Sequence, residues 1–309
     1  MEIFFSTLNQ TAFLFALIAI GYVLAKGKFI PDNSASVLSK LENNVFVPAL
    51  VLGTFMNNFT VETFSTAKWI LLISTVIMLI VLPFAILIPK VVTKDKYMQN
   101  IYTYGLSFSN FGFMGNAVVS VLFPEMFMDY LIFTLPLWVL IYLWGVPELL
   151  IANAGEKKSF KTRLKAFLNP MFVGMIIGMI IGMLQVPLPV WLKSVVKTSG
   201  DCMSPIAMLL TGITVSTISF KKTFSDVRTY IVAIVRLIVF PLVFIAVAKL
   251  VPMGETVFVC ALCSLAMPLG LNTIVIPSAY GKDTTVAAGM AVISHLLSCL
   301  TIPLIFMLI

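Results

Sequence analysis

The chain has 309 residues, of which 60% are hydrophobic and 11% charged, and its mean hydropathy is +1.06. An ordinary soluble domain is about 25% charged, so the composition excludes a soluble globular protein and predicts a polytopic membrane protein. The formal charge of +7 does not indicate nucleic-acid binding. The basic residues lie in short loops between apolar segments, where membrane topology explains them. The first apolar run follows Glu2 and is too long for a signal peptide, so we expect it to be the first span.

Ten apolar segments approach the length of about 20 residues that a membrane-spanning helix needs. The pattern therefore predicts an all-α membrane protein with ten transmembrane helices. Two short stretches, 31–41 and 187–199, have the pattern of amphipathic helices at the membrane surface before the second and seventh spans. In chain order the ten segments are 4–25, 42–58, 67–89, 97–123, 127–151, 167–184, 200–219, 228–250, 254–280 and 284–309.

The basic residues predict the orientation of the chain. Loops that follow odd-numbered spans carry most of the Lys and Arg residues, and the connector at 153–166 is the most basic of them. Such a bias marks the cytoplasmic side. We therefore predict a multi-pass protein of the cell inner (plasma) membrane, with both termini outside the cytoplasm.

The two halves of the chain repeat each other. Pro48 in VPAL corresponds to Pro205 in SPIA, and Gly112 corresponds to Gly270, at offsets of 157 and 158 residues. Each half holds five spans, which is an odd number, so the second half must be inverted relative to the first. Inverted repeats are typical of secondary transporters, whose substrate lies near the membrane midplane. The predicted divisions are a first repeat at 1–152, a cytoplasmic connector at 153–166 and a second repeat at 167–309.

Two matching segments, 107–117 (SFSNFGFMGNA) and 264–273 (SLAMPLGLNT), interrupt the fourth and ninth spans. Glycine and proline favour non-helical backbone. In hydrocarbon an unpaired backbone group costs several kcal/mol, so broken helices occur there only where they are buried or line a cavity. Paired broken helices in inverted repeats indicate a transport site. The candidate substrate-binding residues are Asn110, Gly112, Gly115, Asn116, Pro268, Gly270 and Asn272.

The chemistry of the two breaks favours an anionic or polar substrate. Half-helix N-termini carry a partial positive charge of about half a unit and bind anions. The three asparagines both donate and accept hydrogen bonds, and no acidic residue lies within either break. Small residues and proline also serve helix packing in membranes, which is the alternative interpretation of either break taken alone.

Two ionisable residues lie inside predicted spans. Arg236 is costly there, so we expect it to face the protein interior. It would compensate the charge of an anion, replace a coupling cation or form a structural pair. His295, the only histidine, either relays a proton or is a hydrogen-bonded core residue. The acids Glu42, Glu148 and Asp201 lie near predicted span ends, where interfacial solvation explains them.

Two further motifs indicate structure. Cys260 and Cys263 have CxxC spacing but lack the second pair or nearby histidine of a zinc site, so we expect no metal site and no cofactor. Gly174, Gly178 and Gly182 recur every four residues and form a small-xxx-small contact face. This face predicts either packing within the scaffold of the protein or a homodimer seam.

Five motifs resemble the auxin efflux carrier family of membrane transport proteins, and the resemblance covers the whole chain. The family includes plant auxin exporters and bacterial carriers of malate or malonate. The resemblance implies a scaffold of spans 1, 2, 6 and 7 and a transport domain of spans 3–5 and 8–10. It also implies elevator-type alternating access, with spans 4 and 9 crossing at the midplane. The motifs are VPAL at 47–50, SNFGFMG at 109–115, AMPLG at 266–270, YGKD at 280–283 and TIPL at 301–304.

The resemblance also implies roles at this crossing. By motif alignment, Asn110 corresponds to the asparagine that holds the substrate carboxylate in plant members. Members usually have glycine, any residue and proline at the first crossing, whereas this chain has Gly115, Asn116 and Ala117. Thr273 replaces a second crossover proline. The short connector between the halves is similar to that of bacterial members.

These features predict a secondary active transporter of small organic anions, with malate-like or malonate-like carboxylates as candidates. The sequence leaves the coupling ion open between sodium and proton. A cation or proton antiporter on a similar fold is the alternative, and it would need an acid near the breaks. A membrane hydrolase is disfavoured because no nucleophile–base pair or metal motif such as HExxH is present. A receptor without transport activity is a further alternative.

Overall fold

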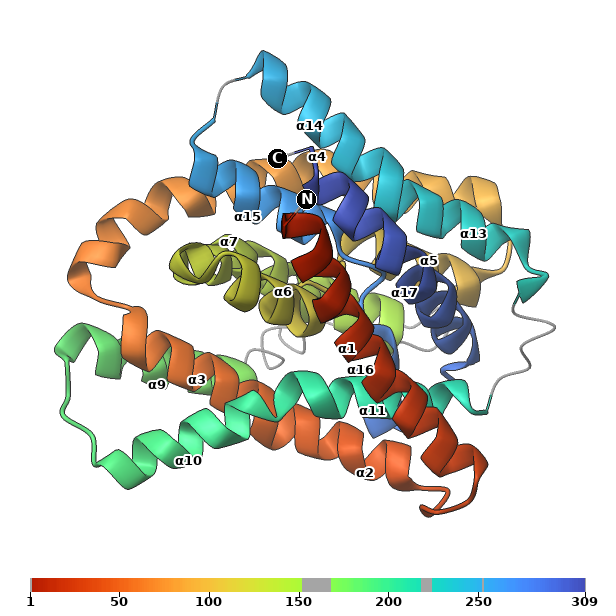
Figure 1. The fold of residues 1–309 in the computed structure, drawn as a ribbon, viewed down its shortest axis with the longest axis horizontal. Coiled ribbons are helices and arrows are strands. Elements are labelled where there is room, and N and C mark those ends of the chain that lie inside the picture. The colour runs from red at the N-terminus through yellow and green to blue at the C-terminus, as the bar shows by residue number, and fades with distance from the viewer. Residues whose placement is uncertain (1, 152–167, 218–223, 252, 309) are drawn as a thin grey trace.

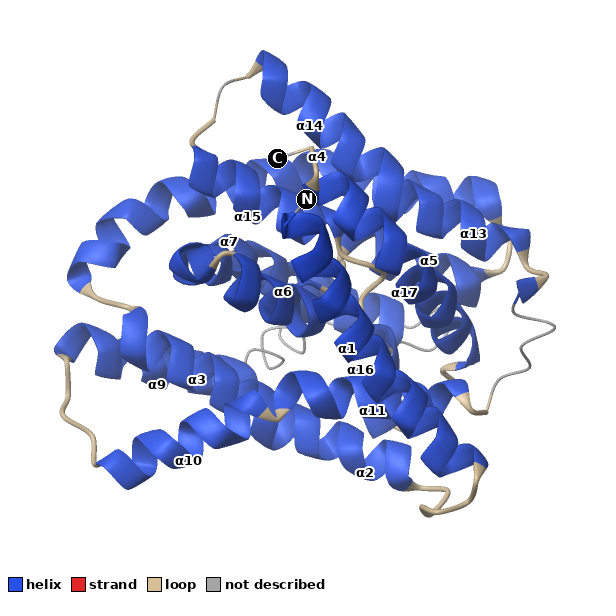
Figure 2. Cartoon of the chain, viewed as in Figure 1, coloured by secondary structure: helices blue, strands red, loops and turns tan. Residues whose placement is uncertain are grey.

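The computed structural model describes residues 2–151, 168–217, 224–251 and 253–308. Within these ranges the chain is almost entirely helical, as Figure 2 shows, and its one strand-like feature is an isolated bridge. The predicted all-helical class is therefore confirmed. The connector at 153–166 lies outside the described residues.

Five of the described helices are long and apolar enough to cross a membrane. They match the first, third, fifth, eighth and tenth predicted spans, as expected for a multi-pass membrane protein. The five are α1 (Glu2–Lys26), α4 (Val61–Val92), η3 (Pro124–Met126) with α7 (Phe127–Leu140) and η4 (Ile141–Leu150), α13 (Val227–Ile234) with η6 (Val235–Val239) and α14 (Phe240–Leu250), and α17 (Thr285–Phe306).

The second and seventh predicted spans are shorter helices that continue from the stretches expected at the membrane surface. α2 (Ser34–Leu41) runs through the π-helical turn η1 (Glu42–Phe46) into α3 (Val47–Asn58). α10 (Val190–Asp201) is followed directly by α11 (Met203–Val215). The hydroxyl of Ser39 in α2 is buried and donates a hydrogen bond to the carbonyl of Val275. The stretch 31–41 is therefore part of the bundle and does not lie apart from it.

Prolines account for two π-helical turns, η1 in the second predicted span and η6 in the eighth. η1 ends two residues before Pro48, and η6 ends two residues before Pro241. A proline ring clashes with the carbonyl four residues earlier, which lies inside the π-turn in both cases, and a widened turn relieves that clash. Such turns are frequent at functional sites. These two hold the ionisable residues Glu42 and Arg236.

The helices pack in two groups. In the first group α1 packs on α11, and α3 packs on α9 (Pro170–Leu184). In the second group α4 packs on α5 (Lys96–Ser107) and α7, and α14 packs on α15 (Glu255–Ala266). In Figure 1 the loop between α1 and α2 lies at the right, and the α3–α4 and α9–α10 loops lie at the left. Successive helices of the first group therefore run back and forth across the molecule.

The glycine face of α9 packs against α3 of the same chain. A Cβ on Gly178 would lie 2.7 Å from the carbonyl oxygen of Leu52, and one on Gly174 would lie 3.0 Å from that of Pro48. Gly182 similarly faces the carbonyl of Phe55. The spacing of these glycines therefore serves packing within the chain, and a homodimer would need another surface.

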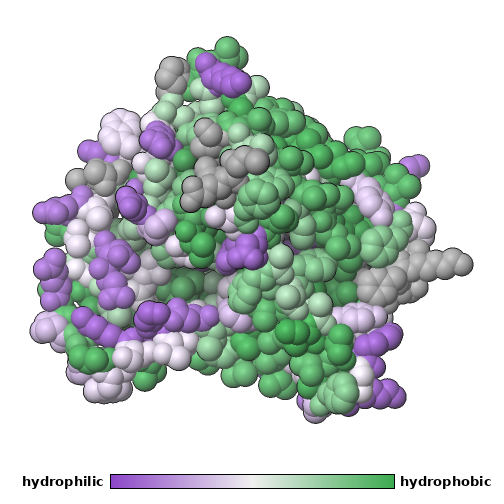
Figure 3. Space-filling model, in the orientation of Figure 1, coloured by the Kyte–Doolittle hydropathy of each residue, from purple (hydrophilic) through white to green (hydrophobic). Residues whose placement is uncertain are grey.

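The surface is apolar over most of the viewed face. Figure 3 shows hydrophilic residues gathered towards the left edge and at the lower right, with hydrophobic residues over most of the rest. The side chains that are more than half-exposed include Leu72, Ile80 and Leu87 on α4 and Val243 on α14. An apolar surface of this extent is not typical of soluble monomers and suits contact with lipid.

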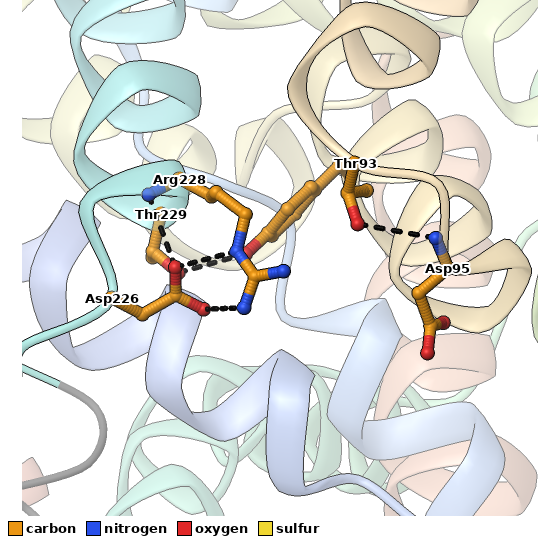
Figure 4. Close-up of polar contacts among 6 residues, drawn as sticks. Thr93, Asp95, Asp226, Arg228 and Thr229 are labelled. Atoms are coloured by element: carbon orange, nitrogen blue, oxygen red, sulfur yellow. Dashed lines mark hydrogen bonds and ion pairs between the residues drawn. The ribbon is translucent and has the colours of Figure 1, made fainter.

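Two aspartates that lie outside the apolar spans cap the starts of helices. The Asp95 carboxylate accepts a hydrogen bond from the Met98 N–H at the start of α5. The Asp226 carboxylate caps α13 and accepts two hydrogen bonds from the Arg228 guanidinium, at 2.8 and 3.0 Å (Figure 4). Hydrogen bonding from Arg228 lowers the pKa of Asp226. This cap fixes the start of the helix that carries Arg236.

Replacing Asp226 with alanine should lower the free energy of unfolding by about 1 kcal/mol at neutral pH, the usual cost of losing such a cap. A carboxyl whose folded pKa is lowered contributes stability above its unfolded pKa, about 3.9. That contribution is lost as the pH falls through the folded value. The gap in unfolding temperature between the wild type and Asp226→Ala, measured in detergent, should therefore shrink below about pH 4. A gap that stays constant across the titration would contradict the role given to this carboxylate.

Candidate functional site

The fourth and ninth predicted spans are each interrupted where the sequence indicates a break. α5 ends at Ser107, and the helix resumes as η2 (Phe111–Gly115) and α6 (Asn116–Leu122). α15 ends at Ala266, and the helix resumes as α16 (Asn272–Ala279). The non-helical residues between them are 108–110 in the first break and 267–271 in the second.

The two breaks lie against each other and exchange backbone hydrogen bonds. The Asn110 N–H donates to the Pro268 carbonyl at 2.7 Å, and Ser109 and Leu269 form an isolated antiparallel bridge. The Ser109 hydroxyl also donates to the carbonyl of Ser264 at 2.6 Å. The backbone groups that each break exposes are thus partly satisfied by the other break, as a buried site in a membrane requires.

Gly270 makes this close approach feasible. A Cβ at this position would lie 2.6 Å from the carbonyl oxygen of Phe108 and 3.1 Å from that of Ser109. Both atoms belong to the backbone, so neither can move aside as the end of a side chain could. Only glycine fits where the second break crosses the first.

Arg236 joins the ends of the two half-helices that precede the breaks. Arg236 is 2% exposed. Its guanidinium donates to the carbonyls of Leu106 at 2.9 Å and Ser264 at 2.7 Å. A longer contact joins it to the carbonyl of Met267 at 3.4 Å. Leu106 lies in the last turn of α5, and Ser264 lies in the last turn of α15. A helix C-terminus carries about half a negative charge and unpaired carbonyls. One buried cation therefore compensates two helix ends.

Asn110 faces His295, and both side chains are buried. The Asn110 Nδ2 lies 3.0 Å from the His295 Nε2, and the His295 Nδ1 lies 2.8 Å from the Ala291 carbonyl. A carbonyl only accepts hydrogen bonds, so Nδ1 carries the proton, and in the neutral ring Nε2 accepts from the Asn110 amide. The Oδ1 atom of Asn110 is buried without a hydrogen-bond partner among the described residues. His295 is therefore buried and hydrogen-bonded, in direct contact with Asn110, the leading candidate for substrate binding.

Asn116 and Gly112 line a different space from Asn110. They border a small cavity of about 20 Å³, between η2, α3, α7 and α9, whose walls are mostly apolar. Gly112 lies against the ring of Trp138, and Gly115 lies against the hydroxyl of Tyr130, which donates to the Phe111 carbonyl. The cavity has room for about one water molecule.

Asn272 begins α16 and lies beside a third buried polar group. The hydroxyl of Tyr104 in α5 approaches the Asn272 side chain without forming a well-aligned hydrogen bond. Pro268 and Gly270 lie in the extended second break, where the carbonyl of Pro268 accepts from Asn110. The structure thus gathers the candidate residues at one crossing, but it turns the three asparagines towards different neighbours.

Of the three acidic residues for which interfacial solvation was expected, Glu42 is the exception. Asp201 is exposed and forms a surface pair with Lys197, and Glu148 is half-buried. Glu42, however, is 0% exposed, and neither of its carboxyl oxygens has a hydrogen-bond partner in the part of the chain that the structure describes. Solvation therefore does not explain Glu42. The described residues contain no cluster of three or more His, Cys, Asp or Glu that would hold a metal ion.

A family model described as membrane transport protein matches residues 6–306 of the chain. The chain belongs to this family. The match confirms the resemblance to the auxin efflux carrier family. A comparison with curated proteins gives no match.

Members of the membrane transport protein family are transporters and not enzymes. The matched range includes both breaks, Arg236, His295 and Glu42. The candidate site of this membrane transport protein is therefore the crossing of the two broken helices, with Arg236 at its centre and His295 beside Asn110.

Proposed function

We propose that this membrane transport protein is a secondary active transporter of small organic anions. The observation that carries the proposal is the charge balance at the two breaks. Four half-helix ends meet there: the negative ends of α5 and α15 are compensated by Arg236, at 2.9 and 2.7 Å. The positive ends of η2 and α16 have no acidic residue in either break to compensate them. The crossing therefore carries a net positive field, which favours a carboxylate.

The polar side chains at the crossing support an oxygen-rich ligand. Asn110, Asn116 and Asn272 supply amide groups from both breaks, and each can donate to a carboxylate. Malate-like and malonate-like dicarboxylates are the candidate substrates, since two carboxylates can engage the two positive helix ends.

Helix packing supports two inverted repeats of five spans, at 1–152 and 167–309. Under such a repeat, the first span corresponds to the sixth, and the second corresponds to the seventh. The repeat then relates the contact of α1 with α11 to the contact of α9 with α3, and both contacts are present. These four helices would form the scaffold, and spans 3–5 and 8–10 would form the transport domain. The loop positions in Figure 1 agree with spans that cross in alternating directions.

The contact between the two groups of helices supports an elevator-type motion. The hydrogen bonds that join them include one from Ser204 to the Phe113 carbonyl at 3.1 Å and one from Gln10 to the Ala117 carbonyl at 3.3 Å. Single side-chain bonds of this kind are easily exchanged as surfaces slide. A cavity of about 640 Å³, lined by Asn43, Asn44 and Tyr280, opens beside α16. Its volume is in the range of small-ligand pockets, and the excess of basic residues in the nearby loops supports a cytoplasmic opening.

A screen of purified protein against mono- and dicarboxylates, with and without sodium, tests this function. A bound substrate at 100 times its dissociation constant should stabilise the protein by about 2.7 kcal/mol, which raises the unfolding temperature. The same compound should accumulate in proteoliposomes that contain the protein and not in empty ones. Absence of both effects for every carboxylate would contradict an organic-anion transporter.

A cation or proton antiporter is the second candidate, because the structure reveals a buried acid, Glu42. Glu42 lies in η1, outside both breaks, whereas the antiporter hypothesis places the acid at the breaks. Exchange of cations driven by a pH gradient, without any organic substrate, would favour the antiporter over the anion carrier.

A further inference from the structure

Glu42 is the most deeply buried acid in the described part of the chain. It is 0% exposed, and both of its carboxyl oxygens lie without a hydrogen-bond partner among the described residues. It sits in the π-turn η1, between the amphipathic helix α2 and the apolar helix α3. The neighbouring residues Lys40 and Asn44 are exposed, so only the Glu42 side of this turn faces inward.

Within the described residues, no positive charge faces Glu42 from the elements that pack against η1. η1 contacts α9, α10, α11 and α16 as well as α2 and α3, and of these α3, α9, α11 and α16 contain no charged residue. α10 carries Lys193, Lys197 and Asp201, which are all exposed, and the last two pair with each other. An ionised carboxylate buried without a partner is strongly unfavourable, and such a group takes up a proton instead. Glu42 is therefore a neutral carboxylic acid in this conformation.

The surroundings of Glu42 favour a proton over a metal cation. Hard cations such as sodium and calcium are held by several oxygen ligands at once. Neither carboxyl oxygen of Glu42 has a hydrogen-bond partner among the described residues, and Glu42 belongs to no cluster of three or more His, Cys, Asp or Glu side chains there. A proton needs only the carboxylate itself.

Glu42 lies at the contact between the scaffold and the broken ninth span. Ser39, one helical turn before it, bonds to Val275 of α16, and η1 also contacts α16. The next residue, Asn43, lines the cavity of about 640 Å³ that also borders Ile276 of α16. The cavity therefore borders the residue next to the acid.

We propose that Glu42 is a proton-binding site that couples protonation to movement of the broken helices past η1. With its proton, Glu42 permits the close packing of η1 and α16. Without it, the carboxylate requires hydration, which the packed contact does not provide, so η1 and α16 separate. The proton is taken from water on one side of the membrane and returned to water on the other. This role rests on the proposed transport function and makes the proton the coupling ion.

The protonation state can be measured without any substrate. Infrared difference spectra between the wild type and Glu42→Gln, at neutral pH in lipid, should show the C=O stretch of a protonated carboxylic acid in the wild type. Raising the pH should remove that band. Glu125→Gln, which changes an exposed acid, is the matched control and should show no such band. A spectrum without the protonated band at neutral pH overturns the proposal.

Transport then tests the coupling, with malate and malonate as the probes. In proteoliposomes, uptake by the wild type should rise at least tenfold with an inward proton gradient and be unaffected by sodium. Glu42→Gln should lose this stimulation while still exchanging internal for external probe, and Glu42→Asp should regain part of it. Full proton stimulation in Glu42→Gln overturns the coupling role even if the infrared band is present. If neither probe is transported by the wild type, the proposed function fails for these compounds, and the infrared result still decides the protonation of Glu42.

Discussion

Replacing Arg236 with methionine is expected to destabilise the protein by about 3 kcal/mol or more. The substitution removes the guanidinium donor from the carbonyls of Leu106 and Ser264, at 2.9 and 2.7 Å, and of the two only Ser264 keeps another side-chain donor, the Ser109 hydroxyl. A buried acceptor left unsatisfied costs about 1–3 kcal/mol, and the two helix ends also lose their compensating charge. Burial of the guanidinium itself is unfavourable, so methionine recovers part of the loss. The backbone carbonyls remain after the substitution and lack the guanidinium donor. The net effect should therefore be a lower unfolding temperature in detergent.

Arg236→Lys is the matched control for this prediction. Lysine keeps the positive charge but presents a single nitrogen, whereas the guanidinium spans two carbonyls from different helices. Its unfolding temperature should lie between those of the wild type and Arg236→Met. If Arg236→Met eluted as a single species and unfolded at the wild-type temperature, the guanidinium would not be what holds α5 and α15 together.

Replacing Asn110 with alanine is expected to abolish carboxylate-dependent binding and flux while the protein still folds. The side chain makes one described hydrogen bond, to His295 at 3.0 Å, and its Oδ1 has no partner within the described residues. The loss of stability should therefore stay near 1 kcal/mol. The backbone N–H that bonds to Pro268 is unchanged, so the two breaks should remain in contact. Uptake of the carboxylate identified in the stability screen, measured in proteoliposomes, provides the test.

Asn58→Ala is a suitable control for Asn110→Ala. Asn58 is exposed at the end of α3, and its amide donates to the Thr54 carbonyl within the same helix. Its substitution should leave uptake unchanged. Equal uptake by Asn110→Ala and the wild type, at equal amounts of folded protein, would remove Asn110 from the binding site.

The helix breaks could be predicted because their causes are local. Glycine, proline and asparagine cluster at 107–117 and 264–273, and the helices stop at Ser107 and Ala266. The contact between the breaks could be predicted from the proposed repeat, which pairs Gly112 with Gly270. Local composition thus carried most of the information about where the helices end and which two breaks belong together.

The partners of the charged residues could not be predicted, because they depend on distant segments. The carbonyl of Leu106 lies 130 residues from Arg236 along the chain, and no pattern near either residue indicates the contact. Glu42 was misplaced for a related reason. Lys40, Asn43 and Asn44 beside it suggest a solvated helix end, and only the packing of η1 against other helices buries this one side chain.

A local pattern also could not predict that the side chains of Asn110 and Asn116 border different spaces. The two asparagines are six residues apart, so the sequence assigns them to one site. The non-helical residues 108–110 and the π-turn η2 intervene, so Asn110 faces His295 while Asn116 faces the cavity beside α3. A single dihedral change at the start of a helix redirects every side chain after it.

The π-turn η1 gives the second span two orientations along its length. A π-turn holds one residue more than an α-helical turn, and one residue corresponds to a rotation of about 100° around the helix axis. The inner face of α2 therefore meets α11 and α16, while the inner face of α3 meets α9 and α10. Under the proposed elevator motion, α3 would stay packed on the scaffold helix α9 while α16 moves past α2. Pro48 maintains the turn, and it therefore keeps the side chains on the inner face of α2 separate from those on the inner face of α3.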